Sequence, residues 1–456
     1  MSVNALYEEA WKPPQKKRQA MRTFWRFILP VFGLLGARLA GAAFGFLSQI
    51  LLARSFPLSD VGVAFLAMSI ATFVSLLMTC GYHTLALTYL ARYQALARPT
   101  LVEAFLAVSR RDMIVAGAVI LVLVALGYFF APVPFPIAKA TVVGTLTALP
   151  LAALRLNNSA ANAQRRFTLS YAPDFVVRSG LLLLFIAALL VVHADRKIDV
   201  VLLALILIAF IVAVGQALIL GPDNAWRKIW TKAPRDLSRY FRHRAVAILL
   251  VTVAAGASAD LTVMLGGVFL PTSAIAVLGV AARLAALVGF FSAASQPFIL
   301  RDLAQAMTRS GNGDIDRAML RMNIAGLSVM GGSIIVFAIF GPLILGIYGS
   351  GYAAGYWPLL LFLVGQAFRT SGGLNSELLA LGGHQVRSAM LCACAVATLV
   401  VLSAILAPRF GMMGLAMASV CAEAFWAVGL AYLTQKLEGR RGDIIGLLVQ
   451  RRPLRP

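Results

Sequence analysis

Charged side chains recur inside the long apolar stretches of this sequence, where a charge is costly unless it faces a cavity or a partner. At the centre of a membrane helix a charge costs about 2.5–3.5 kcal/mol on insertion scales. Arginine keeps its charge and presents a planar fork that matches phosphate oxygens, whereas a buried carboxyl can take up a proton or an ion. Both chemistries are represented among nine such side chains: Arg38, Arg155, Asp174, Arg178, Asp260, Arg283, Arg369, Glu377 and Glu423.

The arginines are the candidate ligands for an anionic cargo. Arg38 shares a helix face with Gln49 in the first apolar stretch, and Arg283 and Arg369 lie in the eighth and tenth. We predict that these residues, together with Arg155, line a substrate cavity and bind phosphate. Each has an alternative: a structural pair with a carboxylate on another helix or, for Arg155 near a helix end, a side chain that extends to the interface.

Two acids are the candidates for ion coupling. Asp260 and Glu423 lie in apolar stretches, where burial raises the cost of the ionised form. The competing interpretation makes either one a fixed partner of an arginine such as Arg283. Asp174 and Arg178 stand four residues apart and can pair with each other along one helix.

The elements that must position these residues are membrane helices. The chain of 456 residues is 60% apolar and 13% charged, whereas soluble domains are about 45–50% apolar and about 25% charged. A bilayer requires about 20 apolar residues per helix. We predict an all-α polytopic membrane protein with twelve spans, at 27–53, 61–90, 112–132, 138–158, 172–193, 198–220, 245–270, 274–299, 321–347, 356–381, 387–407 and 411–434.

The placement of the basic residues predicts orientation. With twelve spans and a cytoplasmic N-terminus, 30 of the 40 Lys and Arg residues lie on the cytoplasmic side, five lie outside and five lie within spans. This asymmetry is the positive-inside rule. It accounts for the net charge of +22 without a nucleic-acid partner and predicts contact with anionic membrane lipids. Both termini are expected in the cytoplasm.

The chain divides into two similar halves. We predict a basic tail (1–26), an N-lobe (27–220), an amphipathic basic linker (221–244), a C-lobe (245–434) and a second basic tail (435–456). An offset of 214 residues superimposes Pro57 on Pro271 and Ser59 on Ser273, each beside a pair of apolar helices. Such repeats are typical of transporters that bind substrate between two lobes. We therefore predict two pseudo-symmetric lobes of six helices each, arranged around a central cavity.

Several stretches resemble polysaccharide-type (O-antigen or exopolysaccharide) flippases of the multidrug/oligosaccharidyl-lipid/polysaccharide superfamily. They are GLLGARLAGAAFGFLSQILLARSFPLSDVGVAFLAMS, GASADLTVMLGGVFLPTSAIAVLGVAARL, FGPLILGIYGSGYAAGYWPLLLFLVGQAF and FGMMGLAMASVCAEAF. The resemblance implies a protein of the bacterial inner membrane that moves a polyprenyl-diphosphate-linked oligosaccharide to the outer leaflet by alternating access. It also allows contact with other polysaccharide-assembly proteins. The alternative is an ion-coupled drug or metabolite antiporter of the same superfamily.

Other chemistries lack their motifs. The sequence contains no phosphate loop of the type G-x-x-x-x-G-K-[ST], no GxGxxG and no HExxH, so we predict neither an enzyme nor a bound cofactor. The four cysteines lie in apolar stretches without the spacing of metal ligands, and we predict no metal site.

Overall fold

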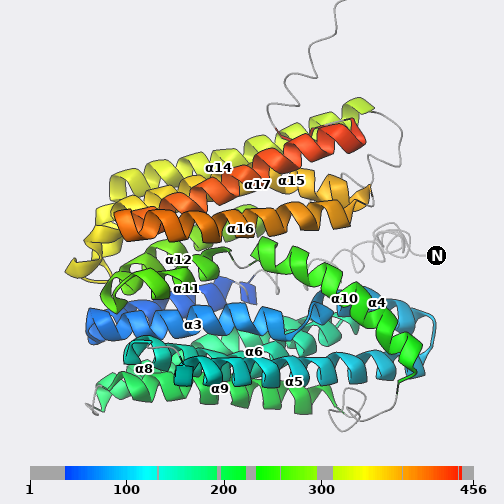
Figure 1. The fold of residues 1–456 in the computed structure, drawn as a ribbon, viewed down its shortest axis with the longest axis horizontal. Helices are drawn as coiled ribbons and strands as arrows, with labels where there is room; N and C mark the ends of the chain where they lie inside the picture. Colours follow the sequence, from blue (N-terminus) through cyan, green and yellow to red (C-terminus); the bar gives the residue numbers. More distant parts are fainter. Residues whose placement is uncertain are drawn as a thin grey trace, which may run out of the picture.

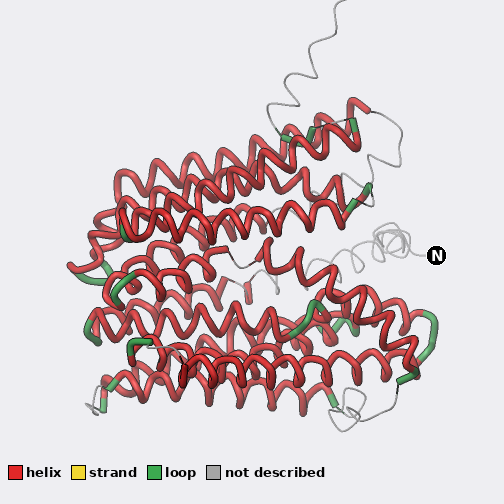
Figure 2. The backbone as a smooth tube through the Cα atoms, viewed as in Figure 1, coloured by secondary structure: helices red, strands yellow, loops and turns green. Residues whose placement is uncertain are grey.

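The computed structural model is helical throughout the residues that it describes, and no strand occurs among them (Figure 2). These residues are 36–37, 39–130, 133–192, 197–221, 233–256, 258–294, 312–382, 384–439 and 441–443. The predicted all-α fold class is thereby confirmed. Arg38, the tail 1–26, residues 222–232 of the linker and residues 444–456 of the second tail lie outside the described residues.

Within the predicted N-lobe (27–220), the first apolar helix among the described residues is Leu39–Ser55. The lobe continues with α3 (Leu58–Met78), α4 (Tyr82–Ala95), α5 (Pro99–Phe130), α6 (Phe135–Ala163), α7 (Phe167–Tyr171), a π-helical turn (Ala172–Val177), α8 (Arg178–Val191) and α9 (Ile198–Leu220). The C-lobe consists of α10 (Arg235–Gly256), α11 (Ser258–Phe269), α12 (Thr272–Ala294), α14 (Asn312–Gly346), a 3-10 turn (Ser350–Gly355), α15 (Tyr356–Leu381), α16 (Gln385–Phe410) and α17 (Met412–Glu438).

Within the described part of the chain, nine helices are long and apolar enough to cross a membrane. The helices Leu39–Ser55 and Ser258–Phe269 are apolar but shorter. The predicted spans therefore correspond to helices, with differences at their boundaries.

One predicted span is interrupted among the described residues. The span 61–90 is divided between α3 and α4, because Cys80 and Gly81 have φ angles of +49° and +82°. This left-handed backbone cannot continue a right-handed helix. The span 245–270 covers the end of α10 and all of α11, and α10 already begins at Arg235, inside the predicted linker.

The repeat extends well beyond the two prolines. Shifted by the same 214 residues, the first residue of α3 falls on that of α12, and the first residue of α9 on that of α17. In Figure 1, α14–α17 form the upper group of helices and α3, α5, α6, α8 and α9 the lower one, while α10–α12 lie between them and α12 packs against α3. Equivalent helices of the two repeats therefore pack against each other at the centre of the molecule.

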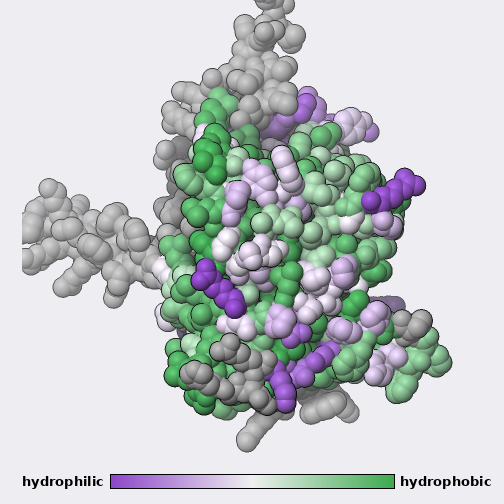
Figure 3. Space-filling model, turned by 90° about the vertical axis from the view of Figure 1, so that its left-hand side faces the viewer, coloured by the Kyte–Doolittle hydropathy of each residue, from purple (hydrophilic) through white to green (hydrophobic). Residues whose placement is uncertain are grey.

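One end of the helix bundle is closed. Gly62 at the start of α3 packs directly on the backbone of Thr272 at the start of α12, where any side chain on the glycine would collide. Arg54 donates from Nε to the carbonyl oxygen of Ile347 in the other lobe, at 2.6 Å. In Figure 3, which shows this end, the described side chains form a continuous, mostly apolar surface. We call it the Leu58 end; the opposite one is the Arg235 end.

A candidate charge site between the lobes

Arg283 lies at the contact between α3 and α12. Its guanidinium carbon is 4.2 Å from the centre of the Phe65 ring, a cation–π distance. Its Nη2 atom donates to the Phe65 carbonyl at 3.3 Å and lies 3.5 Å from the Ser69 hydroxyl. Gly279, one turn before the arginine, makes room for the Phe65 ring, since a β-carbon there would lie 2.9 Å from the ring. The Nη1 atom is buried and has no hydrogen-bond partner in the described part of the chain.

Asp260, on α11, is close to the same contact. The Ser69 hydroxyl hydrogen-bonds its carboxylate, and Arg283 and Arg155 both lie within its electrostatic range. Ser69 thus touches both the acid and the Arg283 guanidinium. The structure brings together two predicted substrate ligands and a predicted ion-coupling acid.

A small cavity opens beside this cluster, lined by helices of both lobes. Its volume is about 160 Å³, below the range of about 300–1,000 Å³ that is typical of small-molecule pockets. The cavity has room for a phosphate group or a hydrated ion, and not for an oligosaccharide. Its charged and polar lining consists of Thr72, Thr147, Arg178, Asp260 and Arg283.

Arg155, on α6, has no carboxylate within salt-bridge distance among the described residues. Its Nε donates to the Ser75 hydroxyl at 3.0 Å. The nearby Asp174 is instead bonded to Arg178 at 2.9 Å, the pair predicted from their spacing. Arg155 is therefore held by a neutral hydroxyl and keeps its positive charge uncompensated by a direct ion pair.

Arg369 and Glu423 form an ion pair in the C-lobe. The Nη2 atom lies 2.9 Å from Oε1, and Nε lies 3.2 Å from both carboxylate oxygens. Arg369 also donates to Ser258 at 2.9 Å and lies 5.9 Å from the Trp426 ring. A buried Glu423 with this partner fits the structural alternative for both residues.

The repeat relates these two arginines. Arg155 and Arg369 are 214 residues apart, as are Ser69 and Arg283. The same shift places Ala209 opposite Glu423, so the N-lobe arginine lacks the acid that neutralises its C-lobe equivalent. The offset of 214 residues, applied to every position of the sequence, predicts this difference between Ala209 and Glu423. The proline and serine pairs alone do not.

The remaining candidates lie elsewhere. Gln49 is half-buried, and its Oε1 atom has no hydrogen-bond partner among the described residues. Arg38 falls outside the described residues, and the side chain of Glu377 does as well. Sequence analysis did not single out Phe65, Ser69 or Ser75, because an aromatic and two serines in apolar helices carry no signal of their own.

Comparison with known proteins extends the description of the fold. No protein-family model matches the sequence, and no curated protein matches it. Among solved structures, the chain is similar to the inward-facing conformation of a multidrug resistance MATE family transporter of the MOP superfamily, with a TM-score of 0.71 and 11% identity over 92% of this chain and 99% of that one. It is also similar to the lipid II flippase MurJ in an inward closed conformation, with a TM-score of 0.67 and 13% identity over 90% and 87%.

An outward-facing conformation of a MATE family transporter superposes less closely, with a TM-score of 0.53 and 12% identity over 90% of this chain and 96% of that one. At these identities the likeness establishes the fold alone. The described helices have the fold of the MATE family and MurJ transporter structures.

Proposed function

We propose that this protein is a flippase that moves a polyprenyl-diphosphate-linked oligosaccharide from the inner to the outer leaflet for surface polysaccharide biosynthesis. It would work by alternating access in the bacterial inner membrane, with both termini in the cytoplasm. The lobes 27–220 and 245–434 would move relative to each other about the linker 221–244. The fold supports a transporter, and the charge of the site supports the choice of cargo.

The uncompensated guanidinium of Arg155 carries the proposal. A charge within a membrane-spanning helix that has no ion pair is costly, and the cost falls when an anion binds. Arg283 adds a second positive group near Asp260, and its Nη1 atom has no hydrogen-bond partner among the described residues. Two arginines around one acid give a site that attracts phosphate and repels cations. A lipid diphosphate satisfies that charge while its acyl chain stays in the bilayer.

Ion coupling is best placed on Asp260. It lies within electrostatic range of Arg155 and Arg283, so a change in its protonation would change the net charge of the site. Glu423, the other acid that we predicted for this role, is occupied by Arg369 at 2.9 Å. In this proposal Glu423 and Arg369 hold the C-lobe together, and Asp260 senses the ion.

Leaflet-specific detection of a labelled lipid-linked oligosaccharide in proteoliposomes tests the proposal. Arg155→Gln and Arg283→Gln should each slow transfer by about 10- to 100-fold, because one charge-assisted phosphate contact contributes about 1.5–3 kcal/mol. Arg387→Gln, at an exposed site on α16, is the matched control and should transfer normally. Unchanged transfer in the Arg155 and Arg283 variants and in their double variant would refute the cationic site.

The alternative is an ion-coupled drug or metabolite antiporter of the same superfamily. The similarity to a multidrug resistance transporter favours it, whereas the positive excess around Asp260 disfavours cationic drugs. A deletion strain separates the two functions. Loss of surface polysaccharide with normal drug tolerance supports the flippase, and drug sensitivity with intact polysaccharide supports the antiporter.

A further inference from the structure

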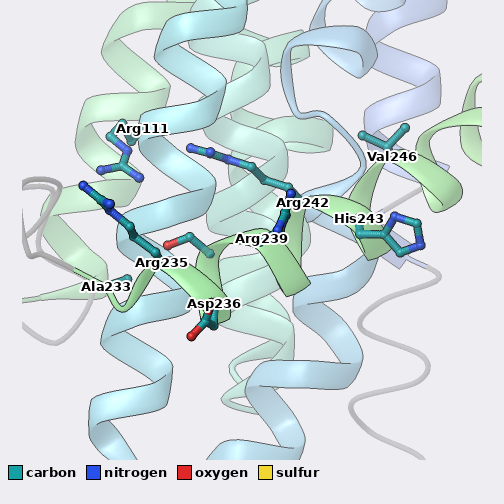
Figure 4. Close-up of a pocket in the computed structure, with 9 residues that line it drawn as sticks. Arg111, Ala233, Arg235, Asp236, Arg239, Arg242, His243 and Val246 are labelled. Carbon is teal, nitrogen blue, oxygen red and sulfur yellow. The ribbon is translucent and has the colours of Figure 1, made fainter.

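A second, larger cavity lies at the Arg235 end of the molecule, between the start of α10 and the adjacent part of α5. Its volume is about 1240 Å³. The charged groups that line it are Arg111, Arg235, Asp236, Arg239, Arg242 and His243. In Figure 4 the side chains of Arg111, Arg235 and Arg242 extend to the same side of the cavity, whereas Asp236 points away from them.

Among the described residues, one of these arginines has an acid partner. Arg242 forms two hydrogen bonds of 2.8 Å to the carboxylate of Asp112, which also accepts one from the Tyr82 hydroxyl at 2.8 Å. In the described part of the chain, Arg111, Arg235 and Arg239 form no salt bridge. Several guanidiniums that converge repel one another unless an anion lies between them. The arrangement is therefore complementary to a negatively charged group.

The surroundings show where that group comes from. On α5, exposed apolar side chains begin one turn after Arg111, at Ile114 and Val115, and continue along the helix. On α10, the exposed Val246 follows His243. Each helix thus passes from basic to lipid-facing within about one turn. A phosphate bound by the arginines would stand directly above a track for acyl chains.

Aromatic residues lie next to these arginines on α10. The Tyr240 hydroxyl lies 2.9 Å from that of Tyr89, and both rings belong to a cluster with Phe105 and Phe241. Tyr240 is 46% exposed. Amphipathic aromatic rings of this kind sit at the head-group level of membranes, and basic pockets between membrane helices bind lipid head groups.

We propose that this cavity is a binding site for an anionic phospholipid of the leaflet at the Arg235 end. Arg111 and Arg235 hold the phosphate, one from each helix, and Arg242 is fixed beside them by Asp112. The lipid thereby bridges α5 of the N-lobe and α10, the first helix of the C-lobe. This site is separate from the one around Asp260, and the proposal does not depend on which cargo the protein carries.

Native mass spectrometry of the full-length protein, titrated with phosphatidylglycerol or phosphatidylcholine, tests the site. Wild type should retain phosphatidylglycerol preferentially. The double variant Arg111→Gln, Arg235→Gln should bind it about 30-fold more weakly, since each of the two basic residues contributes about half of this difference in binding free energy. Arg166→Gln, Arg387→Gln removes the same charge from two exposed sites elsewhere and should bind like wild type.

Three results would overturn the proposal. The first is equal retention of phosphatidylglycerol by wild type and the Arg111, Arg235 variant. The second is an equal loss in the Arg166, Arg387 control, which would indicate general surface charge. The third is displacement of the lipid by millimolar inorganic phosphate, which would indicate a site for soluble anions. Unfolding temperatures measured in neutral lipid should agree among all variants, because neither Arg111 nor Arg235 forms a salt bridge with a described residue.

Discussion

The two lobes are built from the same repeat but treat the same arginine differently. Arg369 of the C-lobe forms an ion pair with Glu423, whereas Arg155 of the N-lobe donates to the Ser75 hydroxyl and has no ion pair with any described residue. The position equivalent to Glu423 is Ala209. In the C-lobe the arginine joins two helices through an ion pair, whereas in the N-lobe the charge of the equivalent arginine is not neutralised by such a pair. A symmetric fold can hold an asymmetric site because one substitution on a neighbouring helix decides whether the charge is neutralised.

The largest expected effect comes from making the lobes alike. Ala209 and Leu154, the neighbour of Arg155, pack in the same buried cluster. Ala209→Glu should therefore give Arg155 a carboxylate partner. This partner would compete with the substrate phosphate, whose interaction with Arg155 is worth roughly 3 kcal/mol, and should reduce oligosaccharide transfer by about 100-fold. Ala209→Gln has the same shape without the charge. If both variants transfer equally in proteoliposomes, the comparison between the lobes has no functional meaning.

The converse change should affect stability. Glu423→Gln leaves Arg369 without its acid and should lower the free energy of unfolding by about 3 kcal/mol. Arg155→Met breaks no ion pair and should cost less than about 1 kcal/mol. Chemical unfolding in detergent measures both variants. Equal losses would show that Arg155 has a structural partner after all.

The contact between equivalent positions Phe65 and Gly279 offers a smaller perturbation. Gly279→Ala should displace the Phe65 ring from Arg283 and cost about 1–2 kcal/mol through overpacking. It should also lengthen the distance between spin labels at Ser59 and Ser273, the equivalent residues at the Leu58 end. Gly215→Ala, where no atom lies within 4 Å of the added carbon, is the control. It should leave the label distance unchanged.

The smallest effect concerns a contact that only one repeat makes. Arg54 reaches across to Ile347, whereas its equivalent is the exposed Val268. Arg54→Gln should cost about 1 kcal/mol or less and slightly broaden the same label distances. A loss of stability as large as that of Gly279→Ala would mean that the closed Leu58 end depends more on the Arg54–Ile347 hydrogen bond than on the α3–α12 contact.

Much of the fold could be predicted from the sequence. The apolar stretches were enough to predict membrane helices, because a bilayer requires long apolar segments. The matched pairs Pro57 and Pro271, and Ser59 and Ser273, indicated a repeat, since a proline is well tolerated where a helix begins. The break at Cys80 and Gly81 was not predicted. It depends on a left-handed backbone that packs against Ala245 of the other lobe, and such contacts leave no local pattern.

The sequence by itself determined which charged residues lie in apolar helices, because residue type and hydropathy are properties of the chain. It could not determine which of them meet. Glu423 could equally have neutralised any arginine on a neighbouring helix, and only the packing of α15 against α17 assigned it to Arg369. The tertiary structure likewise placed Asp260 within electrostatic range of both Arg155 and Arg283. Ion pairing depends on distances of a few ångströms between helices, and hydropathy carries no record of those distances.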